Sequence, residues 1–283
     1  SLRWGLDNRI HGVTSPTGAS VSAPGQATPP LELGGRDFAI DPRTRTIEAI
    51  SGGGQHGASF DDWGRRFVCS NRGHLEMIFY DDRYARRNPH MPAPPARQLI
   101  AVDGGHADVF RISAVEPWRI VRTRLRVAGV IREPVEGGGT PAGYFTRASG
   151  VTVYRGNAWP QEFLGQVFLG DVGSNIVHRK MLDPDGIGMR ARRIDDKREF
   201  LASKEIWFRP VQLANAPDGT LHVLDMYREV IEHPWSLPQG IKKHLDLNSG
   251  NDRGRIWRIF PDGFDRPAIA HLAEVSSIKL LDA

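Results

Sequence analysis

The densest group of polar side chains in this sequence is "MYREVIEHP" at 226–234, which follows the strand-like segment "LHVLD". Tyr227, Arg228 and His233 lie close together there. A histidine can take a proton from a hydroxyl group, and a guanidinium can bind a carboxylate through two hydrogen bonds. A capped loop with an ion pair between Asp225 and Arg228 would use the same residues, so a structural role stays open.

Three other segments place similar side chains beside predicted strands. In "NIVHRKML", His178 and Arg179 are neighbours on a predicted strand. Successive side chains of a strand point to opposite faces, so only one of the two can face a channel. Asn71 and Arg72 follow the strand-like segment "RFVCS" in the same way that Tyr227 and Arg228 follow "LHVLD". A further histidine lies in the Gly-rich loop "GGGQHGAS". The candidate bases are therefore His56, His178 and His233, and the candidate ligand contacts are Asn71, Arg72, Arg179, Tyr227 and Arg228.

An acidic turn recurs along the chain. "GASFDDWGRRFVCSN" at 57–71 has two carboxylates and a glycine ahead of a strand of β-prone residues. The same outline occurs in "WGLDNRIHGVTS" at 4–15 and "NAPDGTLHVLDM" at 215–226, and more loosely in "FLGQVFLGDVGSN" at 163–175. Four copies of one hairpin predict a repeat architecture. Asp61 and Asp62 are accordingly interpreted as turn residues, and a catalytic carboxylate pair is the alternative.

The predicted elements favour an all-β fold. Short strands, frequent turns and long polar loops at 81–95 and 133–142 are typical of a β-propeller rather than a sandwich. Strand patterns for about four blades are visible, so the ring can be incomplete. Residues 1–263 are predicted to form this domain. Residues 264–283 carry helical spacing and predict the first element of a further, helical domain, as expected of a fragment.

Composition excludes several classes of protein. The chain has a net charge of +4 with interspersed signs, which does not favour nucleic-acid binding, and it has no apolar run long enough to cross a bilayer. The single Cys69 excludes an internal disulfide and a covalent c-type haem, and its place in a strand indicates a buried small hydrophobe. The Pro-Asp-Gly segments at 184–186 and 217–219 are typical of turns, and no metal site is predicted.

The motifs resemble a known family. "TVYRG", "EFLAS", "WFRPV", "DGTLHVLDMYREVIEHP" and "GNDRGRIWRI" are similar to segments of the large membrane-bound dehydrogenases of planctomycete-type bacteria, within the glucose/sorbosone dehydrogenase superfamily. The resemblance covers residues 2–262 and implies a six-bladed propeller, followed by HEAT-type helical repeats and often by a cytochrome c domain. It also implies a periplasmic or cell-surface location.

The resemblance implies oxidation of a sugar or polyol hydroxyl with pyrroloquinoline quinone and Ca²⁺, the electrons passing to a cytochrome c domain or protein. Arg209 in "WFRPV" matches a cofactor-binding arginine of that family, with a surface arginine as the alternative. Two positions depart from the pattern, because Gly173 replaces a cofactor-binding lysine and Trp207 replaces a second arginine.

The departures leave a second function open, a non-catalytic propeller module that binds a carbohydrate or a protein. An enzyme requires a histidine within hydrogen-bond reach of a pocket that also contains Arg209 and Arg228. A binding module would instead expose aromatic side chains such as Trp159, Trp207 or Trp235 along a groove.

Overall fold

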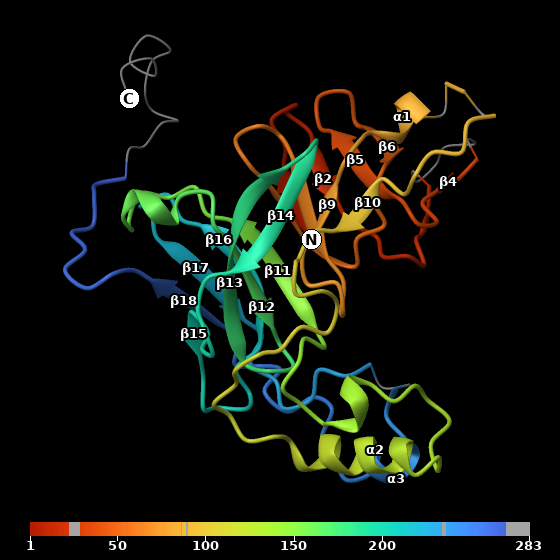
Figure 1. Cartoon of the computed structure of the whole chain (residues 1–283), viewed down its shortest axis with the longest axis vertical. Coiled ribbons are helices and arrows are strands. Elements are labelled where there is room, and N and C mark those ends of the chain that lie inside the picture. Colours follow the sequence, from red (N-terminus) through yellow and green to blue (C-terminus); the bar gives the residue numbers. More distant parts are fainter. Residues whose placement is uncertain (23–28, 86, 89, 234–235, 270–283) are drawn as a thin grey trace.

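The structure, a computed structural model of the 283-residue chain, describes residues 1–22, 29–85, 87–88, 90–233 and 236–269. Within these ranges the strands form four antiparallel sheets of three to five strands and one two-stranded ribbon, with few helices (Figure 1). The all-β expectation is therefore confirmed.

The strands follow one another along the chain with few crossovers. The sheet orders are β1-β2-β5-β6, β10-β9-β8-β7, β11-β12-β13-β14 with β15 beside β13, and β16-β17-β18, and the ribbon is β3-β4. The strands are β1 (Leu2–Trp4), β2 (Ile10–Gly12), β3 (Ser20–Val21), β4 (Leu31–Glu32), β5 (Asp37–Asp41), β6 (Thr46–Ile50), β7 (His56–Phe60), β8 (Arg66–Cys69), β9 (Glu76–Ile78), β10 (Arg97–Leu99), β11 (Ala148–Val153), β12 (Val167–Asp171), β13 (Ile176–Asp185), β14 (Gly188–Arg193), β15 (Leu201–Ala202), β16 (Pro210–Asn215), β17 (Leu221–Asp225) and β18 (Arg255–Ile259). The helices are α1 (Asp82–Ala85), α2 (Pro117–Val127) and α3 (Gln239–Lys242), with 3₁₀ turns η1 (Gly137–Gly139) and η2 (Gln161–Phe163).

The four recurrent segments lie in the first strand pairs of the four sheets. Three of them correspond to β1–β2, β7–β8 and β16–β17, all antiparallel. The looser fourth segment, 163–175, contains only β12 of the antiparallel pair β11–β12, because β11 ends at Val153. In the β7–β8 turn, Asp61 Oδ1 accepts hydrogen bonds from the backbone N–H groups of Trp63 at 3.0 Å and Arg65 at 2.9 Å. The interpretation of this acidic residue as a turn residue is confirmed.

The first strands of the four sheets gather around one line. β11 contacts both β7 and β16, and β1 contacts β7. Arg3 on β1 donates from Nε to Ala58 O at 2.9 Å. Its Nη2 donates to Thr152 Oγ1 at 3.1 Å and to Leu213 O, so one side chain reaches all three neighbouring first strands. Blades of a propeller meet in this way. The number of blades and the closure of a ring stay predictions.

Two glycines allow these first strands to approach closely. The strand pairing is interrupted by a bulge at 56–58 and again at 149–152. Gly57 and Gly150 lie there at φ 63° and 61°, and a Cβ on either would be 2.7 Å from an atom of the next first strand. Only glycine fits both the left-handed backbone and the short distance.

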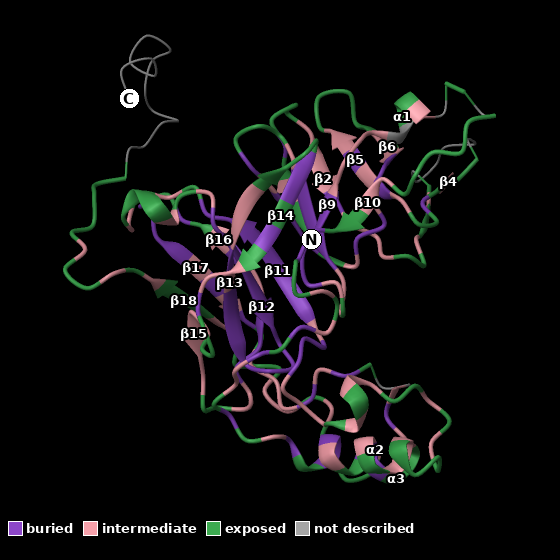
Figure 2. Ribbon diagram, viewed as in Figure 1, coloured by how far each residue is buried: buried purple, intermediate pink, exposed green. Residues whose placement is uncertain are grey.

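The apolar core lies between sheets. One cluster joins the second and third sheets and includes Phe67, Leu75 and Val151, and another, with Phe168 and Leu213, joins the third and fourth. Figure 2 shows the buried strands β11, β12 and β13 in the middle of the molecule. Cys69 is buried, and burial raises the pKa of its thiol, which confirms the prediction of a small buried hydrophobe.

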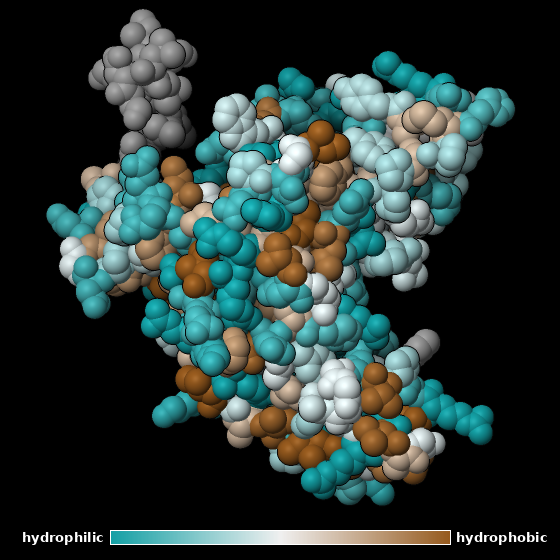
Figure 3. Space-filling view, in the orientation of Figure 1, coloured by the Kyte–Doolittle hydropathy of each residue, from teal (hydrophilic) through white to brown (hydrophobic). Residues whose placement is uncertain are grey.

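The described parts of two long excursions, 100–147 and 226–254, contribute a separate lobe around α2 and α3 (Figure 1). The ends of the first excursion, with Ala107, Val109 and Phe145, pack instead in the core between the second and third sheets. The small core of the lobe contains Trp118, Val230, Leu237 and Ile241. The lobe exposes several valines of α2 and the loop after it, and Figure 3 shows apolar residues gathered there.

The sequence reading did not predict α2. Pro117 occupies its first turn, which is a helix start signal. The buried face of α2, however, carries Arg119 and Arg122 beside Trp118, so the usual apolar spacing of a buried helix face is absent.

The predicted C-terminal helix falls mainly on residues 270–283, outside the described ranges, and residues 264–269 contain no helix. The helical domain stays a prediction. Among the described residues, no helix combines the length and apolar character needed to span a bilayer.

Candidate functional site

Arg209 precedes β16 and is completely buried. Its Nε donates to the carbonyl of Arg228 at 2.8 Å, and Nη1 and Nη2 each donate to Glu116 Oε1 at 3.0 Å. The two remaining N–H groups donate to the carbonyls of Val172 at 2.8 Å and Glu229 at 2.6 Å. A guanidinium has five N–H donors, so Arg209 has none left for a ligand. It joins β16 to both excursions of the lobe.

Arg209 belongs to a larger buried cluster, which we call the arginine–glutamate network: Arg111, Arg119, Arg122, Arg147, Arg209, Glu116 and Glu232. Within it, Arg147 Nη2 lies 2.6 Å from Glu232 Oε2, and Arg119 Nε lies 3.2 Å from Glu116 Oε2. Burial alone would raise the pKa of Glu232, but Arg147, Arg119 and Arg122 outweigh burial and lower that pKa to about 2. Glu232 is therefore ionised in the folded protein at neutral pH.

The cluster singled out at 226–234 is split by the structure. Tyr227 packs its ring under the guanidinium of Arg255 at 4.1 Å and beside Trp207 at 5.4 Å. Arg228 Nη1 donates to Asn248 O at 2.8 Å, and the carbonyl of Arg228 accepts from Arg209. His233 is exposed. The proposed Asp225–Arg228 ion pair does not form, because Asp225 Oδ2 accepts from Arg255 at 2.8 Å.

The candidates near the second sheet lie at the ends of β7 and β8. Asn71 donates its backbone N–H to Gln55 Oε1 at 3.0 Å. Arg72 Nη2 donates to Glu136 Oε1 at 3.1 Å, which ties the loop after β8 to the lobe. Desolvation by neighbouring atoms is the main cause that lowers the pKa of His56, although its side chain is exposed at the start of β7. His56 is thus predominantly neutral at pH 7.

His178 and Arg179 alternate on β13, as predicted. His178 is buried, with Nδ1 2.6 Å from Glu199 Oε2, and burial lowers its pKa. Arg179 donates to both oxygens of Asp195, at 2.7 and 3.0 Å. Neither side chain is among the contacts of Arg209, so the structure does not bring this candidate base and this candidate cation together.

A buried polar cluster beside His178 was missed by the sequence reading. Lys180 is buried and its Nζ donates to both oxygens of Asp103, at 2.7 and 2.8 Å. The ring of His74 stacks on Phe145 with centroids 4.2 Å apart, and burial lowers its pKa to about 4. A lysine in a strand is normally exposed, so its burial had no sequence signal.

The residues of this chain do not fit a pyrroloquinoline quinone site. A Cβ on Gly173 would lie 2.4 Å from Thr146 Oγ1, so a lysine has no room there, and Trp207 offers no cation. All donors of Arg209 are used within the chain. Among the described residues, no group of three or more His, Cys, Asp or Glu side chains is arranged to hold a metal ion. No reaction step is therefore assigned to this cofactor.

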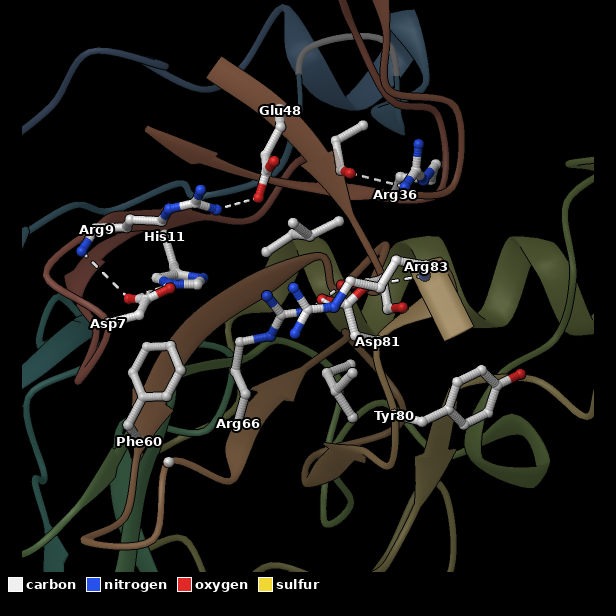
Figure 4. A pocket seen from close by; sticks show the side chains of 15 residues that line it. Asp7, Arg9, His11, Arg36, Glu48, Phe60, Arg66, Tyr80, Asp81 and Arg83 are labelled. Carbon is white, nitrogen blue, oxygen red and sulfur yellow. Dashed lines mark hydrogen bonds and ion pairs between the residues drawn. The ribbon is translucent and has the colours of Figure 1, made fainter. Parts of the chain in front are cut away.

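The larger open cleft lies between the first and second sheets and has a volume of about 590 Å³ (Figure 4). Arg9 pairs with Glu48, and His11 Nε2 lies 3.0 Å from Asp7 Oδ1. Figure 4 shows Arg66 and Phe60 facing the same space from the second sheet. The lining is rich in hydrogen-bond donors and acceptors and includes an aromatic ring.

A smaller cleft of about 200 Å³ lies on the other side of the β7–β8 turn. Gly64 lines the larger cleft, whereas Asp62, Trp63 and Arg155 line the smaller one, so the turn forms a ridge between the two. Trp63 is 83% exposed on this ridge. The sequence signal for it was a tryptophan at the tip of a polar turn, which the turn interpretation did not use.

The predicted aromatic contacts lie elsewhere. Trp159 is half-buried and packs on Tyr154 and Phe163, with ring centroids 5.3 and 5.9 Å away. Trp207 is also half-buried, and Trp235 lies outside the described residues. Among the described tryptophans, Trp63 is the most exposed.

Comparison with known proteins gives two similar solved structures, each described as a glucose dehydrogenase. One is 13% identical, covers 79% of this chain and 78% of that chain, and has a TM-score of 0.33. The other is 15% identical with the same coverage and a TM-score of 0.32. Such low scores carry no argument about activity. No curated protein matches the chain.

The planctomycete-type assignment stays a prediction. A family model with the description "Domain of unknown function (DUF7133)" matches residues 1–263, which is most of the sequence. The chain therefore belongs to the DUF7133 family.

Proposed function

We propose that this chain is a carbohydrate-binding module and that it binds a neutral sugar or polyol on the ridge and in the two clefts beside it. The observation that carries the proposal is the position of Trp63, which is 83% exposed on the ridge between a polar cleft and a more apolar one. A tryptophan ring offers a flat apolar face with a polar tip, which suits the apolar face of a sugar ring bordered by hydroxyl groups.

The charges of the larger cleft support a neutral ligand. Its lining contains four arginines and three carboxylates: Arg9, Arg36, Arg66, Arg83, Asp7, Glu48 and Asp81. A fourth carboxylate, Asp37, lies 3.6 Å from Arg66, so the charges are nearly balanced. Paired guanidinium and carboxylate groups supply donors and acceptors to neighbouring hydroxyl groups without favouring a net charge on the ligand.

The arrangement of the histidines favours binding over catalysis. His178 is buried beside Glu199, His233 is exposed on the lobe, and His56 lies at the start of β7. None of these three candidate bases lines either cleft, and the histidine that does line the larger cleft, His11, has its Nε2 3.0 Å from Asp7 Oδ1. A dehydrogenase needs a base beside the hydroxyl group that it oxidises.

The alternative proposal is a quinone-dependent sugar or polyol dehydrogenase of the periplasm or cell surface that passes electrons to a cytochrome. It rests on the motif resemblance across residues 2–262. The saturated donors of Arg209 and the glycine at 173 give it less support than the binding module has.

The experiment is a glycan array of neutral and anionic oligosaccharides, followed by calorimetric titration of the best neutral hit. Trp63→Ala is expected to weaken binding about tenfold or more, because exposed aromatic anchors dominate such contacts. Phe260→Ala removes a 51% exposed aromatic ring outside both clefts and is the matched control. Equal affinities of the two variants would contradict the proposal. A titration with pyrroloquinoline quinone and Ca²⁺ tests the dehydrogenase alternative independently.

A further inference from the structure

The arginine–glutamate network has an excess of positive charge. Five arginines surround two glutamates, which leaves three formal positive charges: Arg111, Arg119, Arg122, Arg147 and Arg209 against Glu116 and Glu232. Arginine does not lose its proton inside proteins, and an uncompensated buried charge is costly.

The neighbouring groups do not supply the missing negative charge. Arg72 and Arg126 are balanced by Glu133 and Glu136 through three adjoining ion pairs. Asp171 is buried nearby, and burial raises its pKa, so it offsets at most one charge.

A small, partly open cavity of about 10 Å³ borders the network, between α2 and residues 135–147. Five polar atoms of its lining residues form no hydrogen bond within the protein: Arg119 Nη2, Arg122 Nε, Arg122 Nη1, Arg126 Nε and Thr146 Oγ1. Of these, Arg122 Nη1 still lies 3.2 Å from Glu232 Oε2 in an ion pair. Arg119 and Arg122 are each only 3% exposed. The residues that carry these unused donors line the cavity and include four arginines, Arg119, Arg122, Arg126 and Arg147, against one carboxylate, Glu136.

We propose that this cavity binds a single small inorganic anion of the size and charge of chloride. The volume is close to the space for one water-sized particle and is too small for sulfate or phosphate. A water molecule could accept hydrogen bonds from the arginines but would leave their charge uncompensated. This site does not depend on the carbohydrate proposal, because no residue of the cavity lines either cleft.

Thermal unfolding of the whole chain in sodium chloride and in sodium gluconate, at equal ionic strength, tests the proposal. Because a ligand that binds only the folded state stabilises it, Tm is expected to be about 2–4 °C higher in chloride. Crystals grown in sodium bromide are expected to give an anomalous peak inside the cavity. Equal Tm values together with no bromide peak would overturn the proposal.

Matched variants on one helix separate site binding from general salt effects. Arg122→Gln removes a donor of the cavity and is expected to abolish the chloride-dependent Tm shift, whereas exposed Arg124→Gln retains it. Loss of the shift in both variants, or in neither, would contradict the site. If Arg122→Gln does not fold, Thr146→Val removes only the unpartnered hydroxyl, and an unchanged bromide occupancy in that variant would count against the site.

Discussion

At the residue scale, Arg209 shows how a side chain that matches a cofactor-binding position can serve the fold instead. Its five donors bind Glu116 and three backbone carbonyls, and these acceptors come from several parts of the chain. The sequence could place Arg209 before a strand, but not in the interior. Burial of a charge depends on partners such as Glu116, which is 93 residues away.

We expect Arg209→Met to lower the free energy of unfolding by about 3–5 kcal/mol, because Glu116 is left as a buried charge with fewer partners. Urea denaturation measures this loss. The control Arg190→Met changes an exposed arginine of β14 and is expected to alter stability by less than about 0.5 kcal/mol. If Arg209→Met were as stable as the wild type, the structural role of Arg209 would be contradicted, and it would again be a candidate ligand contact.

His74 predicts an acid sensitivity. Its pKa is about 4 in the folded protein because of burial, against an ordinary value of 6.5. The unfolded chain therefore binds more protons between these values, so stability is lost as pH falls from about 6.5 towards 4, by up to about 3 kcal/mol.

His74→Phe removes this titration. We expect the variant to lose about 3 kcal/mol less than the wild type when unfolding is measured at pH 7 and again at pH 4. His56 and His178, whose pKa values are also lowered, contribute with the same sign in both proteins. Equal losses in wild type and variant would contradict the account of His74.

At the element scale, the hairpins were predictable and the lobe was not. The turn residues and apolar alternation of these hairpins are local signals, and three of the four formed as expected, whereas segment 163–175 contains only one strand of its pair. The lobe depends on contacts between 100–147 and 226–254. The buried face of α2 carries arginines, so it lacks the apolar spacing that marks a buried helix face in a sequence. Local periodicity does not report such long-range ion pairing.

The bulged first strands lead to a prediction about glycine. Gly57→Ala is expected to destabilise the protein by about 2–4 kcal/mol. The alanine would have to adopt a left-handed backbone conformation, and its Cβ would lie 2.7 Å from Val151 N. Gly186→Ala also has a positive φ but has no atom within 4 Å of its Cβ, so it should cost only about 1–2 kcal/mol. Thermal and urea unfolding compare the two, and equal costs would contradict the close approach of β7 and β11.

At the scale of the whole molecule, the lobe and the sheets hold different parts of the account: buried ion pairs lie at the lobe, and the open clefts lie between the sheets. Several candidates chosen from the sequence, such as Arg209 and Arg228, lie at the lobe end, and there the cations are held in ion pairs and by backbone carbonyls. The two clefts lie beside the β7–β8 turn, in a hairpin that the sequence identified as scaffold. The sequence could identify Asp61 as a turn residue, but the exposure of Trp63 depends on how neighbouring sheets pack.

The most direct measurement is a crystal structure of the chain with a bound neutral oligosaccharide selected from the glycan array. The account predicts a sugar ring stacked on Trp63 with hydroxyl groups reaching into the larger or the smaller cleft. A sugar bound instead at the lobe beside Arg228 or His233, with Trp63 free, would contradict the central claim.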